Sequence, residues 1–237
     1  MQNILENLAS VHALIDKAAA SCGRDRSEVR LLCVSKTKPL EQIKEAWEQG
    51  ERHFGESYVN EAVDKIKTLK EQGVSDIVWH FIGPLQSNKT RPVAAHFDVV
   101  ESVDRMKVLE RLNDQRPEGM APLKIMIQVN ISHEEQKQGC EEQELPELLK
   151  SASLMPNVEV IGLMGVARID APEEELNASF ARLRELRDQY QQLYPELKEL
   201  SMGMTADMAS AVANGSTEVR IGSAIFGERE YKNRAQS

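Results

Sequence analysis

Cysteine, aromatic residues and positive charge are all scarce in this sequence. Its 237 residues include three cysteines, Cys22, Cys33 and Cys140, whose spacing matches neither a metal-binding motif nor a CxxC pair. A disulfide framework and a metal site are therefore disfavoured, and we expect a reducing compartment, the cytoplasm. The 29 Lys and Arg residues against 38 Asp and Glu residues leave a net charge of −9. This balance is unsuited to an extended nucleic-acid groove.

Long apolar runs and a basic leader segment are also absent. No run approaches the ~20 apolar residues that a membrane-spanning helix needs, and the opening MQNILENLAS has no basic start. We therefore expect no membrane contact. The hydrophobic content of 41% is ample for a folded core, and no linker or change in composition marks a boundary. We expect residues 1–237 to form a single domain.

Apolar segments rich in β-branched residues alternate with amphipathic helical segments along the whole chain. An N-terminal helix with Leu8 and Val11 on its apolar face precedes the first strand. The eight predicted strands cover residues 29–35, 53–55, 77–82, 97–102, 123–130, 158–165, 199–202 and 218–221. Strands joined by crossover helices run parallel. Eight such repeats predict an α/β fold, a closed (β/α)8 TIM barrel.

An open, doubly wound sheet is the structural alternative. Its usual GxGxxG phosphate signature is missing, because the first strand continues into Ser35-Lys36-Thr37-Lys38-Pro39. The clearest of the predicted helices begins with Asp170 as its N-cap and Pro172 in its first turn. The barrel is the favoured interpretation.

Lysines at the end of the first strand are candidates for covalent chemistry, because barrel active sites lie at the carboxyl ends of the strands. Lys36 has the same parity as Leu32 and Val34 and so points inward if these fill the barrel. Apolar walls and the nearby charge of Lys38 favour the neutral amine, which attacks aldehydes. The alternative is that both lysines are solvated loop residues.

The last two strands end in segments typical of a phosphate site. Hydroxyls and glycines follow both strands, at Ser201, Gly203 and Thr205 and at Gly222 and Ser223. A ligand that carries both an aldehyde and a phosphate fits this arrangement. The lysine amine would react with the aldehyde, and the hydroxyl and glycine segments would bind the phosphate. Pyridoxal 5′-phosphate (PLP) and the sugar phosphate of a class I aldolase are the two candidates.

Arg220 favours PLP, because it has the parity of Gly222 and can reach a pyridine nitrogen across the barrel mouth. A permanent cation there keeps the nitrogen unprotonated and makes the ring a weak electron sink. The alternative for Arg220 is an ordinary salt bridge.

At these residues the chain resembles the pyridoxal phosphate homeostasis protein family (YggS/PROSC type), whose fold is similar to the barrel domain of alanine racemase. The resemblance covers nearly the full length. It rests on the segments LLCVSKTKP (31–39), RHFGESYVNEAVDK (52–65), WHFIGPLQSNK (79–89), QVNIS (128–132), GLMGVA (162–167) and LSMGMTADMASAVANGSTEVRIGSAIFG (200–227).

This resemblance implies a role for each strand-end residue. Lys36 would hold PLP as an internal aldimine, and Arg220 would face the pyridine nitrogen. The phosphate would be surrounded by Ser201, Gly203, Thr205, Gly222 and Ser223. Two positions depart from the commonest family pattern, Ser57 in place of Asn and Thr205 in place of Ser, and both keep a short polar side chain.

The family implies buffering and delivery of PLP to apoenzymes, with little or no catalysis. A racemase needs a second base, usually a tyrosine supplied with another domain, and ten residues follow Gly227. Tyr58 is expected to cover the ring. Other candidates for lining the pocket are Lys38, His80, Asn130 and Met164.

Two enzymatic alternatives stay open at this point. One is a PLP-dependent amino-acid racemase, and the other is a class I aldolase with Glu56 as its base. The remaining lysines with some cationic potential, which we expect to be solvated, are Lys65, Lys89, Lys137 and Lys232.

Overall fold

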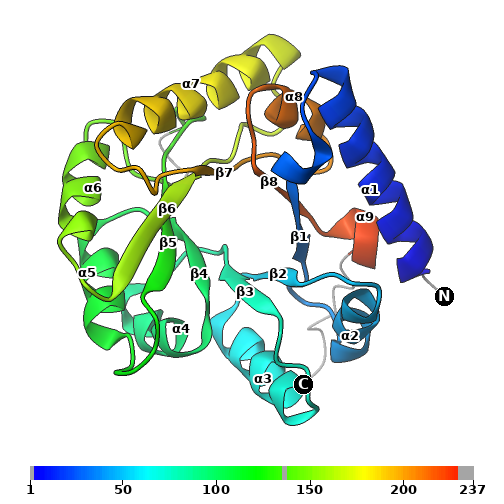
Figure 1. Cartoon of the computed structure of the whole chain (residues 1–237), viewed down its shortest axis with the longest axis horizontal. Coiled ribbons are helices and arrows are strands. Elements are labelled where there is room, and N and C mark those ends of the chain that lie inside the picture. The colour runs from blue at the N-terminus through cyan, green and yellow to red at the C-terminus, as the bar shows by residue number, and fades with distance from the viewer. Residues whose placement is uncertain (1–2, 135–137, 229–237) are drawn as a thin grey trace, which may run out of the picture.

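Eight parallel strands close into a barrel in the computed structural model, which describes residues 3–134 and 138–228 (Figure 1). The strands are β1 (Arg30–Val34), β2 (His53–Glu56), β3 (Val78–Phe81), β4 (Val99–Val103), β5 (Leu123–Gln128), β6 (Val158–Met164), β7 (Glu199–Ser201) and β8 (Glu218–Ile221). Each strand pairs with the next, and β8 pairs with β1, with Arg30 opposite Glu218 and Cys33 opposite Ile221. The predicted TIM barrel is confirmed.

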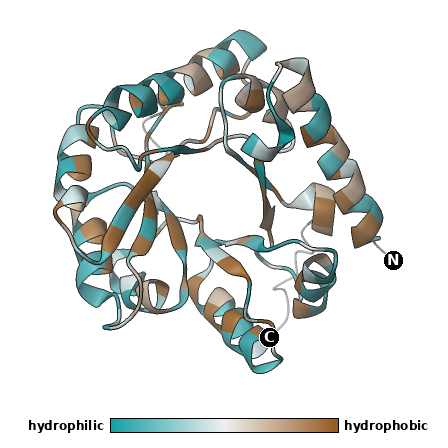
Figure 2. Cartoon of the chain, viewed as in Figure 1, coloured by the Kyte–Doolittle hydropathy of each residue, from teal (hydrophilic) through white to brown (hydrophobic). Residues whose placement is uncertain are grey.

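Helices surround the barrel and bury their apolar faces against it (Figure 2). They are α1 (Ile4–Ser21), α2 (Leu40–Glu48), α3 (Val59–Glu71), α4 (Thr90–His96), α5 (Met106–Gln115), α6 (Leu145–Ser153), α7 (Glu173–Gln191), α8 (Met208–Ala213) and α9 (Ser223–Phe226). Short 3-10 turns cover Arg26–Glu28 and Ser87–Lys89. Within the described residues, no helix is long and apolar enough to span a bilayer.

Helix α1 completes the outer layer where the last helices are too short to do so. Helix α8 has six residues and α9 has four. Beside them α1 packs its buried side chains Ile4, Leu8, Val11 and Ile15 into the core. The predicted N-terminal helix is thus confirmed, and its role is to cover the seam of the barrel near β8 and β1.

The main core lies between the strands and the helices, whereas the interior of the barrel is largely polar. Outward-facing side chains such as Leu31 and Cys33 belong to the large apolar cluster. Inside the barrel the apolar cluster is small and consists of Val99, Met126 and Met164. This alternation follows from the two-residue period of a strand. Charged groups consequently occupy much of the interior.

The prediction that Asp170 caps α7 is wrong. Asp170 has a φ of +58° and lies in the preceding loop, and α7 begins at Glu173 after Pro172. Pro172 has no backbone N–H to satisfy and holds the extended entry into the helix (φ −57°, ψ 152°). Glu173, Glu174 and Glu175 then place negative charge at the positive end of the helix dipole.

Candidate functional site

A cavity of about 540 Å³ opens at the carboxyl ends of the strands and brings together six residues that the sequence predicted. Its described lining residues are Val34, Lys36, Lys38, Ser57, Ile82, Val166, Met204, Thr205, Ala206, Arg220, Gly222, Ser223 and Gly227. Among the predicted residues it therefore joins Lys36 and Lys38 from the end of β1 with Arg220, Gly222 and Ser223 from β8 and Thr205 after β7. Closure of the barrel makes β1 and β8 neighbours.

Lys36 sits at the junction of two cavities. It lines the one just described and a neighbouring one of about 670 Å³, which also includes Ser57 and Tyr58. The chain turns sharply at Thr37, which has a φ of +64° and whose backbone N–H donates to Glu61 Oε1 over 2.7 Å. The Lys38 N–H donates to the Ser35 carbonyl over 3.0 Å. These contacts fix the backbone that carries the Lys36 amine.

A buried ion pair contacts Ser35, the residue that precedes Lys36. The Lys65 Nζ donates to Glu56 Oε1 and to the carbonyl of Ser35, both over 2.9 Å, and the Ser35 hydroxyl donates to the same Glu56 oxygen over 2.7 Å. Burial raises the pKa of Glu56, while Lys65 opposes this rise. The expectation that Lys65 is solvated is wrong, since its side chain is only 8% exposed. Helix α3 carries it inward over the end of β2.

Arg220 is buried and held from behind by protein groups. Its Nη1 donates to the Ser201 hydroxyl over 2.8 Å, and its Nη2 donates to the Gly165 carbonyl over 3.0 Å. The Ser201 hydroxyl in turn donates to Glu101 Oε2 over 2.6 Å. The guanidinium is therefore fixed in the wall of the cavity with a carboxylate behind it.

Ser201 and Gly203 lie behind the cavity wall in the described part of the chain. Ser201 is fully buried and contacts Arg220 and Glu101. Gly203 has a φ of +100°, and a Cβ there would lie 2.6 Å from the Cβ of Ala211 in α8. Glycine at this position allows the close approach of α8 to β7. Neither residue is among the described lining of the cavity, whereas Thr205, Gly222 and Ser223 are. The predicted contact of Ser201 and Gly203 with a phosphate stays a prediction.

The wall of the cavity that is predicted to bind phosphate is formed by the residues at the start of α9. Gly222 precedes the helix, and an added Cβ would meet the Val34 carbonyl oxygen at 3.2 Å, so the backbones of β1 and β8 lie close together here. The first N–H groups of a helix lack intrahelical partners and favour anions. Together with the Thr205 and Ser223 hydroxyls they suit a phosphate group. Lys38 lines the cavity while its Nζ donates to the carbonyls of Gly227 and Glu228, both over 2.8 Å.

The other predicted lining residues lie elsewhere among the described residues. Tyr58 borders the neighbouring cavity beside Lys36 and is 48% exposed. The Asn130 side chain donates to the Glu134 carbonyl and to Glu141. Met164 packs in the small interior cluster, and His80 lies deeper inside the barrel. Lys89 borders the Tyr58 cavity, and Lys137 and Lys232 fall outside the described residues.

A buried polar cluster extends from Arg220 toward the opposite end of the barrel. His80 Nδ1 lies 2.7 Å from Glu101 Oε1 and 3.9 Å from Glu218 Oε1, and its Nε2 lies 2.9 Å from His53 Nδ1. Arg30 donates to Glu218 Oε2 over 2.7 Å. Sequence reasoning missed Glu101 and Glu218, although a carboxylate inside an apolar strand such as VVESV is a signal of this kind.

The cluster places one ligand atom each of His80, Glu101 and Glu218 within 4.8 Å of one another, which is the spacing of a potential metal site. Two arginines already compensate the two carboxylates, because Arg30 pairs with Glu218 and Arg220 reaches Glu101 through Ser201. An added divalent cation would leave this buried region with excess positive charge. The geometry therefore favours a structural role over a metal site: the cluster balances the charge of Arg220 and holds its side chain in place.

Glu218 is expected to make stability depend on pH near neutrality. Burial, and then the like charge of Glu101, raise its pKa from 4.5 to about 7. The native state thus binds the proton more tightly than the unfolded chain does, so this stabilisation is complete below pH 4.5 and is lost as the pH rises through about 7. Burial lowers the pKa values of His53 and His80 from 6.5. These two histidines therefore reduce the stability of the native state only as the pH falls below 6.5.

We therefore expect the free energy of unfolding to fall by about 1 kcal/mol between roughly pH 6.5 and 8. Urea unfolding at several pH values measures this change. The fall should be smaller in Glu218→Gln and unchanged in Glu196→Gln, a variant at an exposed position. An identical pH profile for Glu218→Gln and the wild type would contradict the expectation.

Comparison with known proteins places this barrel in a family. Residues 7–230 match the family described as "Alanine racemase, N-terminal domain". The "Pyridoxal phosphate homeostasis protein" of Vibrio cholerae serotype O1 is 50% identical over 236 residues, covering 99% of this chain and 100% of the relative. The protein of the same name from Escherichia coli K12 is 48% identical over 237 residues, with 99% and 100% coverage.

Solved structures agree with this placement. PipY from Synechococcus elongatus PCC7942, in a structure described as having PLP bound, superposes with a TM-score of 0.83 at 36% identity over 95% of this chain and 100% of PipY. An alanine racemase from Clostridium difficile 630 has a TM-score of 0.75 at 10% identity, covering 99% of this chain and 60% of the racemase, and shows the shared fold. This chain therefore belongs to the pyridoxal phosphate homeostasis protein family, which shares the N-terminal barrel domain of alanine racemase.

Proposed function

We propose that this protein binds PLP covalently on Lys36, buffers this reactive aldehyde in the cytoplasm and delivers it to apoenzymes, with little or no turnover. The observation that carries the proposal is the shared cavity. One wall presents the Lys36 amine, and the facing residues are Arg220, Thr205, Gly222 and Ser223. The names of the relatives and the PLP-bound PipY structure support the same cofactor.

Each wall residue has a distinct task in this proposal. The neutral Lys36 amine forms a carbon–nitrogen double bond with the aldehyde carbon, and the aldehyde oxygen leaves as water. Thr205, Ser223 and the amide groups at the start of α9 hold the phosphate. Arg220, fixed by Ser201 and the Gly165 carbonyl, would hold the ring nitrogen.

The same residues explain low turnover. PLP supplies an electron sink when its ring nitrogen is protonated, and a permanent guanidinium charge at that nitrogen keeps it unprotonated. A racemase also needs a base on each face of the cofactor. Among the described residues that line the two cavities beside Lys36, Tyr58 is the only tyrosine, and there is no histidine. Tyr58 is half exposed, which suits a cover that opens for loading and release.

Glu56 fits a structural role better than that of an aldolase base. Its Oε1 accepts hydrogen bonds from Ser35 and Lys65, and neither of its oxygens lines the cavity among the described residues. A base in an aldolase must reach the carbon next to the imine. We therefore assign Glu56 to holding the Lys36 loop.

Borohydride reduction of the PLP-loaded protein tests the attachment. Reduction should fix the cofactor irreversibly, and peptide mass mapping should place it on Lys36. No label, or a label only on another lysine, would reject the proposed covalent site.

Incubation of the loaded protein with single amino-acid enantiomers then tests turnover. Sustained α-proton exchange at about 1 per second or faster, an ordinary enzymatic rate, would favour the racemase.

A further inference from the structure

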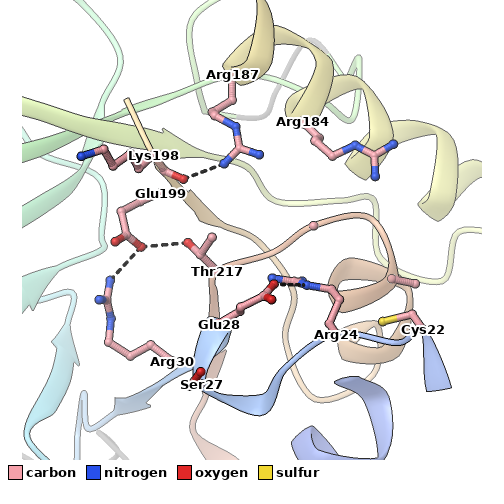
Figure 3. Close-up of a pocket in the computed structure, with 12 residues that line it drawn as sticks. Cys22, Arg24, Ser27, Glu28, Arg30, Arg184, Arg187, Lys198, Glu199 and Thr217 are labelled. Carbon is pink, nitrogen blue, oxygen red and sulfur yellow. Dashed lines mark hydrogen bonds and ion pairs between the residues drawn. The ribbon is translucent and has the colours of Figure 1, made fainter. Parts of the chain in front are cut away.

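A second, strongly basic cleft lies at the amino-terminal end of the barrel (Figure 3). It has a volume of about 650 Å³ and is bounded by the connection from α1 to β1, by α7 and by the residues that begin β1 and β7. The charged residues that line it are five cations and two acids: Arg24, Arg30, Arg184, Arg187, Lys198, Glu28 and Glu199. The resulting surplus of three positive charges contrasts with the net charge of −9 on the whole chain.

Four of the five cations each have a carboxylate partner, and Arg184 is the exception among the described residues. Glu28 contacts Arg24 over 3.0 Å, and Arg30 contacts Glu199 over 3.2 Å and the buried Glu218, which lies outside the described lining, over 2.7 Å. Arg187 and Lys198 pair with Asp188 and Glu196, whose exposed carboxylates lie outside the described lining of the cleft. Clustered like charges repel one another and are stabilised by a bound anion.

Arg184 is the least compensated of these cations. Within the described residues it makes no hydrogen bond and no ion pair, and Figure 3 shows its side chain extending from α7 into the cleft. A purely stabilising cluster at this end of the barrel would pair its arginines with carboxylates, as Arg24 and Arg30 are paired. The isolated guanidinium therefore points to a ligand.

Two further guanidinium groups are held in place by backbone carbonyls. Arg24 Nη1 donates to the carbonyls of Val212 and Ser216, both over 2.8 Å, and Arg187 Nη1 donates to the Lys198 carbonyl over 2.6 Å. Their side chains are 17% and 16% exposed. The Nη2 atoms of both have no hydrogen-bond partner among the described residues, so two immobilised donors are available. Fixed donors lose little conformational entropy when they bind.

We propose that this cleft binds a small molecule carrying a phosphate group. Planar guanidinium groups match phosphate oxygens in charge and geometry, and four of them line this cleft. The positive charge is confined to one cleft of an acidic protein, which suits a small ligand rather than an extended polymer. The site lies at the opposite end of the barrel from Lys36, because Arg30 and Glu199 begin their strands whereas Lys36 follows the end of β1. Phosphate binding in this cleft does not require PLP on Lys36.

Isothermal titration calorimetry with inorganic phosphate and with pyrophosphate, at constant ionic strength, tests the proposal. The wild-type protein should show a saturable site for pyrophosphate. The affinity should fall about tenfold or more in Arg184→Gln, which removes a charge-assisted contact, and binding should be lost in Arg184→Glu. Substitution of Arg184 breaks no hydrogen bond or ion pair within the described residues. Both variants should therefore keep the wild-type unfolding midpoint.

Matched variants separate this cleft from other sources of binding. Arg182→Gln and Arg182→Glu change the same charges two residues earlier on α7, where Arg182 pairs with Glu142 outside the cleft. Ser223→Ala alters the wall predicted to bind phosphate at the other mouth of the barrel. Both sets should leave pyrophosphate binding at the cleft unchanged. Equal weakening by the Arg182 and Arg184 variants would mean an adventitious ion only. Loss confined to Ser223→Ala, or no saturable heat in the wild type, would also overturn the proposal.

Discussion

Lys36→Ala is expected to abolish the visible absorption of PLP bound as an imine and to weaken PLP binding by about 100-fold or more. The lining of the cavity contains one other amine, that of Lys38, among the described residues, and its Nζ donates to the carbonyls of Gly227 and Glu228. The second amine in the described lining of this cavity is thus engaged by backbone carbonyls. Arg220, Thr205 and Ser223 remain and should support weak, non-covalent binding. Absorption spectra and equilibrium titration with PLP measure the two effects.

Two further variants show whether the amine itself is responsible. Lys36→Arg keeps the positive charge but lacks a nucleophilic amine, so it should also lose the visible band. Lys17→Ala removes an exposed lysine of α1 and should behave as the wild type. Retention of the band in Lys36→Ala and Lys36→Arg would contradict the assignment.

Lys65→Met is expected to lower the free energy of unfolding by about 3–5 kcal/mol, because it leaves a buried carboxylate without its cation. Glu56 is fully buried, and Lys65 bridges it to the Ser35 carbonyl and to Glu61. Methionine retains the length of the side chain and removes its charge. Urea denaturation measures the change. The Lys36 loop rests on Ser35 and Glu61, so PLP affinity should fall as well.

A double variant identifies the cause of this instability. Adding Glu56→Gln to Lys65→Met removes the orphaned charge and should recover part of the lost stability. Lys67→Met, which changes an exposed lysine on the same helix, should have little effect. Equal destabilisation by Lys65→Met and Lys67→Met would show that methionine at either position of α3 lowers stability. Loss of the buried ion pair would then not be the cause.

The barrel was predictable because it depends on periodicity, and periodicity also indicated which strand ends would share a cavity. Alternation with a period of two places Arg220 on the inner side of β8 and predicts the same for Lys36, which follows the end of β1, and parallel strands end at the same edge of the barrel. The structure confirms that Lys36 and Arg220 line one cavity. The start of α7 was less predictable, because Asp170 and Pro172 are both plausible at a helix entry and the local backbone decided between them.

The roles of Ser201 and Lys65 depended on contacts between segments far apart in the sequence. Ser201 lies at a strand end, and the structure shows that its hydroxyl donates to Glu101 on β4 and accepts from Arg220 on β8. Lys65 looks like a solvated helix residue, but α3 packs it over the end of β2 against Glu56. No local pattern reports a partner that is 100 residues away, as Glu101 is from Ser201.

The sequence by itself determined the eightfold repeat, the inward parity of Lys36 and the hydroxyl and glycine segments that follow the last two strands. These features follow from the geometry of single strands and turns. Only the tertiary structure decided how charge is distributed inside the barrel, with Arg220 supported by Glu101, and how cations gather in the cleft around Arg184. The physical reason is that burial and charge pairing depend on which strands and helices become neighbours when the barrel closes.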